Sequence, residues 1–261
     1  IRTTEFILVG LPHVVGMVRV MYASVFLLYL FCLMGNGLII MMVIRDCHLQ
    51  KPMYFFLSNL SLKDIGHTTT FMPKLLFNYV SSNNSICFYC CLIQLFFYFL
   101  FGVTEFFIIT FISLDRYLAI CHPLRHSTIM TSRILKIAKL PYCTSNIINH
   151  FYFLIMSSLV FILISYLFIL HTILQISSTS RQQKAFSTCA SHLVVVCILY
   201  GLVFYVYLRP TVKNSSFSTM KSVSILYTIV TPVLNPFIYT IRNNEVKNSV
   251  CKMLGRKIPV P

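Results

Sequence analysis

Acidic residues and tryptophan are scarce in this chain. Its 261 residues include 6 Asp and Glu in total and no Trp. So few acids leave little for acid–base catalysis, and the sequence has no zinc-ligand spacing, nucleophile motif or phosphate-binding glycine loop. We therefore expect a protein that is not an enzyme and that needs no cofactor for catalysis.

Charged residues of either sign are also few. They make up 10% of the chain against 57% hydrophobic residues, with a mean hydropathy of +0.79, a balance more apolar than that of ordinary soluble domains. Apolar runs of about 20 residues, the length that crosses a bilayer as a helix, recur along the sequence. Continuous runs favour helices, because lipid requires every backbone group to be paired internally. The sequence predicts an all-α membrane protein with six convincing transmembrane helices at 21–44, 53–73, 91–114, 151–175, 189–208 and 221–241.

The net charge of +15 indicates orientation in a membrane rather than nucleic-acid binding. The basic residues lie mainly in short segments beside apolar runs, and such segments face the cytoplasm. The loop 45–52 is basic, whereas the loop 81–90 has no charge. We therefore expect residues 1–20 outside the cell without a cleavable signal peptide, a transmembrane domain at 21–241, and a cytoplasmic tail with a short amphipathic helix at 242–261.

The spacing of the spans leaves a gap in the middle of the chain. Between Arg133 and His150 the only apolar run is 134–140, and lysines interrupt it. About seven residues rise only about 10 Å as a helix, a third of the bilayer core. Six crossings would place both termini on one side, whereas the basic tail predicts a cytoplasmic C-terminus. The charge pattern and the number of spans therefore predict different sides of the membrane for the C-terminus.

Four charged residues are candidates for function. Asp64 lies midway along the second span and Glu105 midway along the third, where a carboxylate is costly unless it is protonated, paired or bound to a cation. The two can hold a cation or share a proton, and two protonated structural acids explain them equally well. At the end of the third span, Asp115 and Arg116 can pair, part when helices move, or simply anchor the helix at the interface.

Aromatic residues recur at helical spacing on two spans, where such a stripe lines either the core or a ligand pocket. The last span contains Thr231-Pro232 and Asn235-Pro236, and its prolines free backbone carbonyls and predict a kinked helix. Asn36 lies between two glycines, which favours hydrogen bonding to another helix. The stripes consist of Tyr98, Phe99, Gly102 and Val103 in the third span and Tyr200, Val203, Phe204 and Tyr207 in 189–208.

Several motifs together resemble one receptor family. They are GN at 35–36, PMYFFL at 52–57, DRYLAIC at 115–121, KAFSTCASHL at 184–193 and PVLNPFIY at 232–239. In combination they resemble the olfactory receptor family of rhodopsin-like receptors, over nearly the whole chain except its middle. The resemblance implies a seven-helix bundle, of which this chain lacks helix four and much of the second extracellular loop.

The resemblance also implies a function: binding of a small volatile odorant among the helices, and signalling through a stimulatory olfactory G protein that raises cyclic AMP. It assigns Asp64 and Glu105 to a possible sodium site, Arg116 to the switch that faces the G protein, and Tyr200 to an aromatic toggle. It implies a disulfide at Cys91, whose partner cysteine this chain lacks. The other positions carried over are Ile225 and Thr228, which join the two stripes as pocket residues, and Asn235, Pro236 and Tyr239 in the last helix.

Such a receptor is expected in the plasma membrane as a multi-pass protein, and Asn83 in the outer loop fits the glycan acceptor pattern. Two other readings stay open. A truncated family member retained in the endoplasmic reticulum would carry the same motifs without signalling. A small transporter or cation channel would use Asp64 and Glu105, although the sequence has no internal repeat or ring of pore-lining charges.

Overall fold

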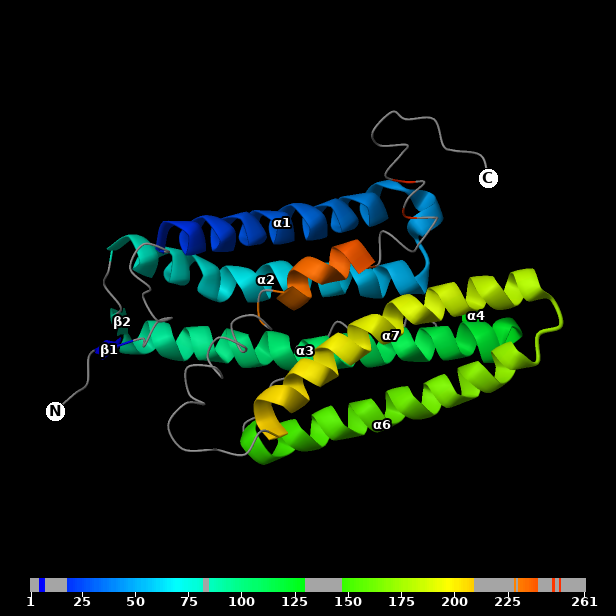
Figure 1. Ribbon diagram of the computed structural model, residues 1–261. Coiled ribbons are helices and arrows are strands. Elements are labelled where there is room, and N and C mark those ends of the chain that lie inside the picture. The colour runs from blue at the N-terminus through cyan, green and yellow to red at the C-terminus, as the bar shows by residue number, and fades with distance from the viewer. Residues whose placement is uncertain are drawn as a thin grey trace.

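Helices make up almost all of the structure, a computed structural model that describes residues 5–7, 18–81, 85–129, 147–208 and 230–238, together with residues 228, 246 and 249. A short 3-10 helix, η1 (Cys47–Leu49), lies between the first two long helices, and a short helix, α4 (Pro123–Ile129), follows the third. The long helices lie side by side along one axis (Figure 1). They are α1 (Val18–Arg45), α2 (Pro52–Ser81), α3 (Phe88–Cys121), α6 (Ile147–Leu174) and α7 (Thr179–Leu208).

Each long helix contains one predicted span almost entirely, and most of them continue beyond it. The five predicted positions are therefore confirmed, and the sixth predicted span, 221–241, is described over 230–238. α3 has 34 residues, a rise of about 51 Å against a hydrocarbon core of about 30 Å. α7 begins at Thr179, although its apolar run begins at Cys189. An apolar run marks the part of a helix that lies in lipid, whereas the backbone hydrogen bonds continue into the polar flanks.

The outer faces of the bundle are apolar. Within the described residues, four helices are long and apolar enough to cross a membrane. On α6, Phe153 is 73% exposed and Leu167 67% exposed, and contiguous exposure of such side chains suits lipid rather than water. α2 differs, because it carries Lys63, Asp64 and His67 on its buried face. The four candidate spans are Arg19–Arg45, Phe88–Cys121, Ile155–Leu174 and Thr179–Tyr205.

The core of the bundle lies where α3 meets α2, α6 and α7. Phe111 of α3 stacks on Phe56 of α2, with ring centroids 5.7 Å apart. Nearer the middle of α2, a Cβ atom added to Gly66 would lie 2.6 Å from the Phe101 ring of α3. Only glycine permits this approach without a shift of the ring, so Gly66 sets the close contact of α2 and α3 beside their charged residues.

α3 and α6 run in the same direction. Tyr117 contacts Phe168, and four residues later Cys121 lies 3.2 Å from Thr172, so the C-terminal ends of the two helices meet. Two spans joined by a simple loop would run in opposite directions, so the connection from α4 to α6 joins opposite ends of the bundle. The predicted loss of a fourth span concerns the residues 130–146, which lie outside the described part of the chain.

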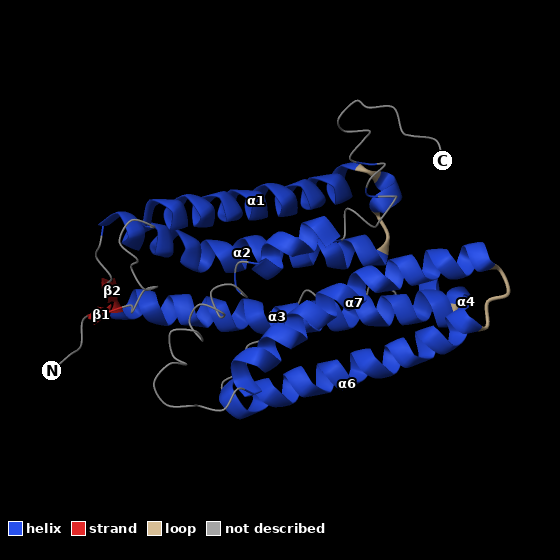
Figure 2. Ribbon diagram, in the orientation of Figure 1, coloured by secondary structure: helices blue, strands red, loops and turns tan. Residues whose placement is uncertain are grey.

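The two ends of the described chain lie at opposite ends of the bundle. The strands β1 (Glu5–Ile7) and β2 (Ser85–Cys87) pair antiparallel next to the start of α3 (Figure 2). At the other end, the Ser249 hydroxyl donates a hydrogen bond to Asp46, which caps η1. Six crossings would have placed both termini on one side, so the six apolar runs alone did not predict this arrangement.

Candidate functional site

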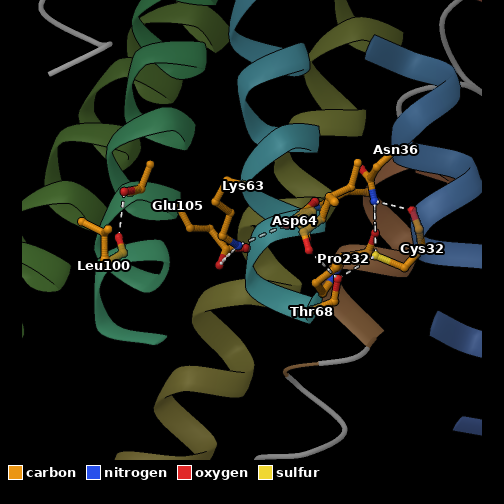
Figure 3. A network of polar contacts seen from close by, with 11 residues as sticks. Cys32, Asn36, Lys63, Asp64, Thr68, Leu100, Glu105 and Pro232 are labelled. Atoms are coloured by element: carbon orange, nitrogen blue, oxygen red, sulfur yellow. Dashed lines mark hydrogen bonds and ion pairs between the residues drawn. The ribbon is translucent and has the colours of Figure 1, made fainter. Parts of the chain in front are cut away.

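An ammonium group lies between the two intramembrane carboxylates (Figure 3). The Lys63 Nζ atom is 3.1 Å from Asp64 Oδ1 and 2.6 Å from Glu105 Oε2. All three side chains are at most 2% exposed. Because Lys63 and Asp64 belong to α2 and Glu105 to α3, the Lys63–Glu105 ion pair joins the two helices near mid-length. The structure thus brings Asp64 and Glu105 to one site, with Lys63 between them.

The polar network continues to α1 and to residues 230–238. Asn235 donates from Nδ2 to Asp64 Oδ2 at 2.8 Å. Asn36 donates from Nδ2 to the Pro232 carbonyl at 3.0 Å, which confirms the predicted interhelical hydrogen bond of Asn36. That carbonyl would bond the backbone N–H four residues later in a regular helix, but Pro236 has none. The Asn36 amide therefore replaces a hydrogen bond that the proline removes.

The environment of Asp64 and Glu105 bears directly on the sodium ion that the resemblance implied. Both oxygens of Asp64 and one oxygen of Glu105 already accept from nitrogen donors. A hard cation needs several such oxygens as ligands, and here it would also lie close to a positive ammonium group. In this arrangement the residues present do not fit a sodium ion.

Three predicted pocket residues lie close together beside open space. Tyr98 of α3 contacts the His67 ring of α2, with centroids 5.3 Å apart, and its side chain hydrogen-bonds that of Thr228. Gly102 follows one helical turn later on the same face of α3. Among the described residues, no heavy atom lies within 4 Å of a Cβ atom added there, so the space beside Gly102 is open with respect to them.

The next turn of α3 meets the predicted toggle on α7. The Tyr200 ring contacts the Phe106 ring at 5.5 Å, and its hydroxyl lies 2.7 Å from that of Ser158 on α6. One turn further along α7, the Phe204 ring lies 6.4 Å from Tyr200. Tyr200 is only 3% exposed. A movement of the Tyr200 side chain would therefore change contacts on α3, α6 and α7 together.

His67 is a buried polar side chain with unused hydrogen-bonding capacity. It is 3% exposed, and neither ring nitrogen has a hydrogen-bond partner among the described residues. The rings of Phe71, Tyr98 and Phe101 surround it, with centroids 5.3 to 6.3 Å away. A buried polar atom left unpaired costs roughly 1–3 kcal/mol, so this imidazole favours a ligand group or a water molecule beside it.

At the far end of α3, the adjacent charges pair as one of the sequence hypotheses proposed. Asp115 Oδ2 accepts from Arg116 at 2.7 Å, and its other oxygen lies 2.9 Å from His126 Nε2 on α4. Asp115 is 1% exposed, while the Arg116 side chain is 15% exposed. Asp115 therefore holds Arg116 and also fastens α4 to α3.

A second buried histidine joins three helices. His192 of α7 lies with Nδ1 2.7 Å from the Tyr166 hydroxyl of α6 and with Nε2 3.1 Å from the Ile109 carbonyl of α3. A carbonyl only accepts, so in a neutral ring Nε2 carries the hydrogen and Nδ1 accepts from Tyr166. His192 is 1% exposed, and both of its nitrogens are used.

The disulfide expected at Cys91 is corrected by the structure. Cys91 is a half-buried free thiol, whereas Cys87 and Cys90, three residues apart, are bridged. The bridge lies at the start of α3, where Cys87 is also the N-cap residue. The position expected for the partner of Cys91 has Tyr152-Phe153.

The other predicted site residues are distributed along the same helices. Asn83, Ile225 and Tyr239 lie outside the described residues, as does the side chain of Tyr207. Phe99 and Val103 are half-buried on α3, and Val203 is buried on α7. Gly35 of α1 packs against Pro236, where an added Cβ would lie 3.1 Å from the ring.

Sequence reasoning did not single out Lys63, His67 or His192 as site residues. A basic residue in the middle of a span is as costly as an acidic one, so Lys63 beside Asp64 could have been singled out by the same rule. His67 lies one turn after Lys63 on the same helix face. His192 lies inside the KAFSTCASHL motif, but a sequence motif does not show which residues of other helices His192 contacts.

Comparison with known proteins decides the family. The rhodopsin-type family described as "7 transmembrane receptor (rhodopsin family)" matches residues 35–148, and the family described as "Olfactory receptor" matches residues 136–257. Olfactory receptor 6X1 of Homo sapiens is 46% identical over 297 residues, which cover 96% of this chain and 95% of the relative. The chain belongs to the olfactory receptor family.

Further human relatives agree with this assignment. Olfactory receptor 6C1 is 38% identical, covering 98% of this chain and 96% of its own length. Olfactory receptor 6S1 is 39% identical, covering 98% and 91%. Members of this family are G-protein-coupled membrane receptors and not enzymes, which confirms the exclusion that the scarcity of acids suggested.

This olfactory receptor lacks internal residues that a relative has. Its alignment with olfactory receptor 6X1 spans 297 residues, more than the 261 residues of the chain itself. An alignment can exceed the chain only where the relative has residues without a counterpart here. The finding supports the internal loss that the sequence analysis assigned to helix four.

Proposed function

We propose that this olfactory receptor binds a small, mainly apolar odorant beside Gly102 and signals through a stimulatory olfactory G protein. The open space beside Gly102 carries the proposal, because Tyr98 and Phe106 lie one helical turn away on either side. Their rings contact His67 and Tyr200 respectively. Apolar walls with a few polar groups are typical of small-molecule pockets, and the unpaired His67 ring favours an odorant with one hydrogen-bonding group.

The contacts of α3 offer a route from this space to the G-protein side. Tyr200 contacts α3 at Phe106, and His192 contacts it one turn further on at Ile109. α3 then continues to Asp115 and Arg116. A ligand that binds one arrangement of α7 more tightly shifts the balance between two states, and release of Arg116 would expose it to a G protein.

Odorant-dependent cyclic AMP in cells displaying the receptor tests this function. The panel pairs each odorant that has one alcohol or carbonyl group with its hydrocarbon analogue, and the oxygenated members are expected to be more potent. Gly102→Leu fills the space, so it should raise the half-maximal concentration by about tenfold or more. The exposed Gly201→Leu on α7 is a matched control. Silence of the surface-displayed receptor to the whole panel would refute the proposal.

A second candidate function is that of a truncated receptor retained in the endoplasmic reticulum. The alignment that is longer than the chain supports it. An N-terminal tag stained with and without permeabilisation separates the two candidates. Staining only after permeabilisation favours retention, and staining of intact cells favours a plasma-membrane receptor.

The tail 242–261 is proposed to be cytoplasmic. Ser249 lies at the η1 end of the bundle beside Asp46, and the basic loop at this end predicts the cytoplasmic side. A C-terminal tag should therefore be protected from protease on intact cells. Digestion of the tag on intact cells would show that the tail is outside and contradict the proposed orientation.

Asp115→Asn is expected to raise cyclic AMP in the absence of odorant by roughly 3- to 10-fold, because a neutral amide holds Arg116 less firmly and shifts the two-state balance by about 1 kcal/mol. The measurement is basal cyclic AMP at equal surface display. Arg116→Ala serves as the comparison, since it should abolish signalling. Unchanged basal signalling in Asp115→Asn would show that this ion pair does not hold the inactive state.

A further inference from the structure

The side chain of Lys63 is unusual in its position and its partners. It lies on the buried face of α2 with Leu60 and His67. The preceding residue, Leu62, points away from this face and is 61% exposed. A lysine near a helix end can extend its ammonium to the membrane surface. Lys63 is eleven residues after the start of α2 at Pro52 and farther from its end at Ser81, so its head group must find partners inside the bundle.

The ammonium finds one partner on each of two helices. Neighbouring residues on a helix point in different directions, so contact with Asp64 requires the lysine stem to curve toward the bundle interior. The same Nζ atom contacts Glu105 of α3 at 2.6 Å, shorter than its 3.1 Å contact with Asp64. Lys63 thus stands between two acids that could otherwise hold a free cation.

The charges of this cluster explain why a cation is needed at all. Two carboxylates near each other in a membrane interior cannot both be ionised unless a positive charge compensates them. Asn235 stabilises Asp64 with an N–H group, but an amide brings no net charge. Among the described residues, Lys63 is the cation in contact with both carboxylates.

We infer that Lys63 is a built-in cation that takes the place of a bound sodium ion between Asp64 and Glu105. The receptor would then have this counter-charge attached to α2 and present at every salt concentration. Sodium would find its oxygen ligands occupied and a like charge beside them. Stability would not depend on sodium, and removing the ammonium would create a sodium-binding site. This inference does not depend on odorant binding or on coupling to a G protein.

Thermal unfolding of the full chain in lipid nanodiscs tests the inference. A thiol-reactive fluorophore reports unfolding, because Cys32 and Cys189 are buried in the native state. Unfolding midpoints are compared in sodium chloride and in N-methylglucamine chloride of equal ionic strength. The wild-type midpoint is expected to differ by less than about 1 °C, as for any ion that the native state does not bind. A wild-type midpoint several degrees higher in sodium would overturn the inference.

Lys63→Met keeps an unbranched side chain and removes the charge. Without sodium its midpoint should fall by roughly 10 °C, because buried carboxylates lose their counter-charge. Sodium at about ten times its dissociation constant should restore about 3–5 °C. Lys74→Met, on the same helix outside the cluster, controls for a general loss of positive charge and should show no response to sodium. A folded Lys63→Met variant without a sodium response would also overturn the inference.

The double variant Lys63→Met/Glu105→Leu keeps the inference testable if Lys63→Met does not fold. It removes the ammonium together with the carboxylate closest to it. It should fold, regain at least half of the lost midpoint, and show no response to sodium. If the double variant also fails to fold, Lys63 is needed for packing rather than as a counter-charge, and the inference is wrong.

Discussion

Glu105→Leu is expected to lower the free energy of unfolding by about 3–5 kcal/mol, one of the two largest effects predicted for this receptor. The substitution leaves the Lys63 ammonium buried in the bundle with Asp64 as its remaining acidic contact. This removal is costly, because the Lys63 ammonium keeps its desolvation cost and loses the closer of its two acidic contacts. Leucine fills a similar volume, so loss of packing contributes little to this effect.

A double-mutant cycle separates the ion pair from other roles of Glu105. The free energies of unfolding of the wild type, Glu105→Leu, Lys63→Met and the double variant are measured in the same nanodiscs. The double variant should lose much less stability than the sum of the single variants, since an apolar pair replaces an ion pair. Strictly additive losses would contradict direct pairing of Lys63 with Glu105.

The membrane interior explains why this cluster is so sensitive. Water would solvate any one of its charges, but in the bundle each charge depends on the others and on the Asn235 amide. The cluster joins α2 to α3 and to residues 230–238, and Asn36 extends it to α1. Elements distant in the sequence are therefore fixed relative to one another by polar contacts, in lipid that gives little hydrophobic drive for helix association.

Much of the fold could be predicted from the sequence. Continuous apolar runs gave the positions of the five long described helices, because only a helix satisfies its own backbone in lipid. The same reasoning selected Asp64 and Glu105 as costly residues that had to be protonated, paired or bound to a cation. It also selected Asn36, whose amide does reach another helix at Pro232.

The remainder depends on contacts that a linear sequence does not record. Lys63 meets Glu105 from another helix, and this pairing depends on how far α2 and α3 are rotated and shifted against each other. Gly66 helps to set that fit through its contact with the Phe101 ring. The common direction of α3 and α6 could not be predicted either, because hydropathy shows where apolar runs lie and not in which direction each helix runs.

His192→Leu is expected to lower the free energy of unfolding by about 2–4 kcal/mol. The ring joins α7 to α6 through Tyr166 and to α3 through the Ile109 carbonyl. Leucine offers neither hydrogen bond, and the hydroxyl of Tyr166, a residue only 4% exposed, loses its bond to His192. The loss should appear as a lower unfolding midpoint in the nanodisc assay.

Tyr166→Phe is the matched comparison for this prediction. It removes one of the two hydrogen bonds of His192 and leaves the Nδ1 acceptor without this donor, while the bond to Ile109 remains, so it should cost only about 1 kcal/mol. In the double variant His192→Leu/Tyr166→Phe, both partners of this hydrogen bond are gone, and the loss should be smaller than the sum of the single losses. Equal losses for His192→Leu and Tyr166→Phe would mean that the bond to Ile109 contributes nothing. In that case His192 would stabilise the contact of α7 with α6 but not with α3. The proposed route from Tyr200 to Arg116 along α3 would then lose its second contact, the one at Ile109.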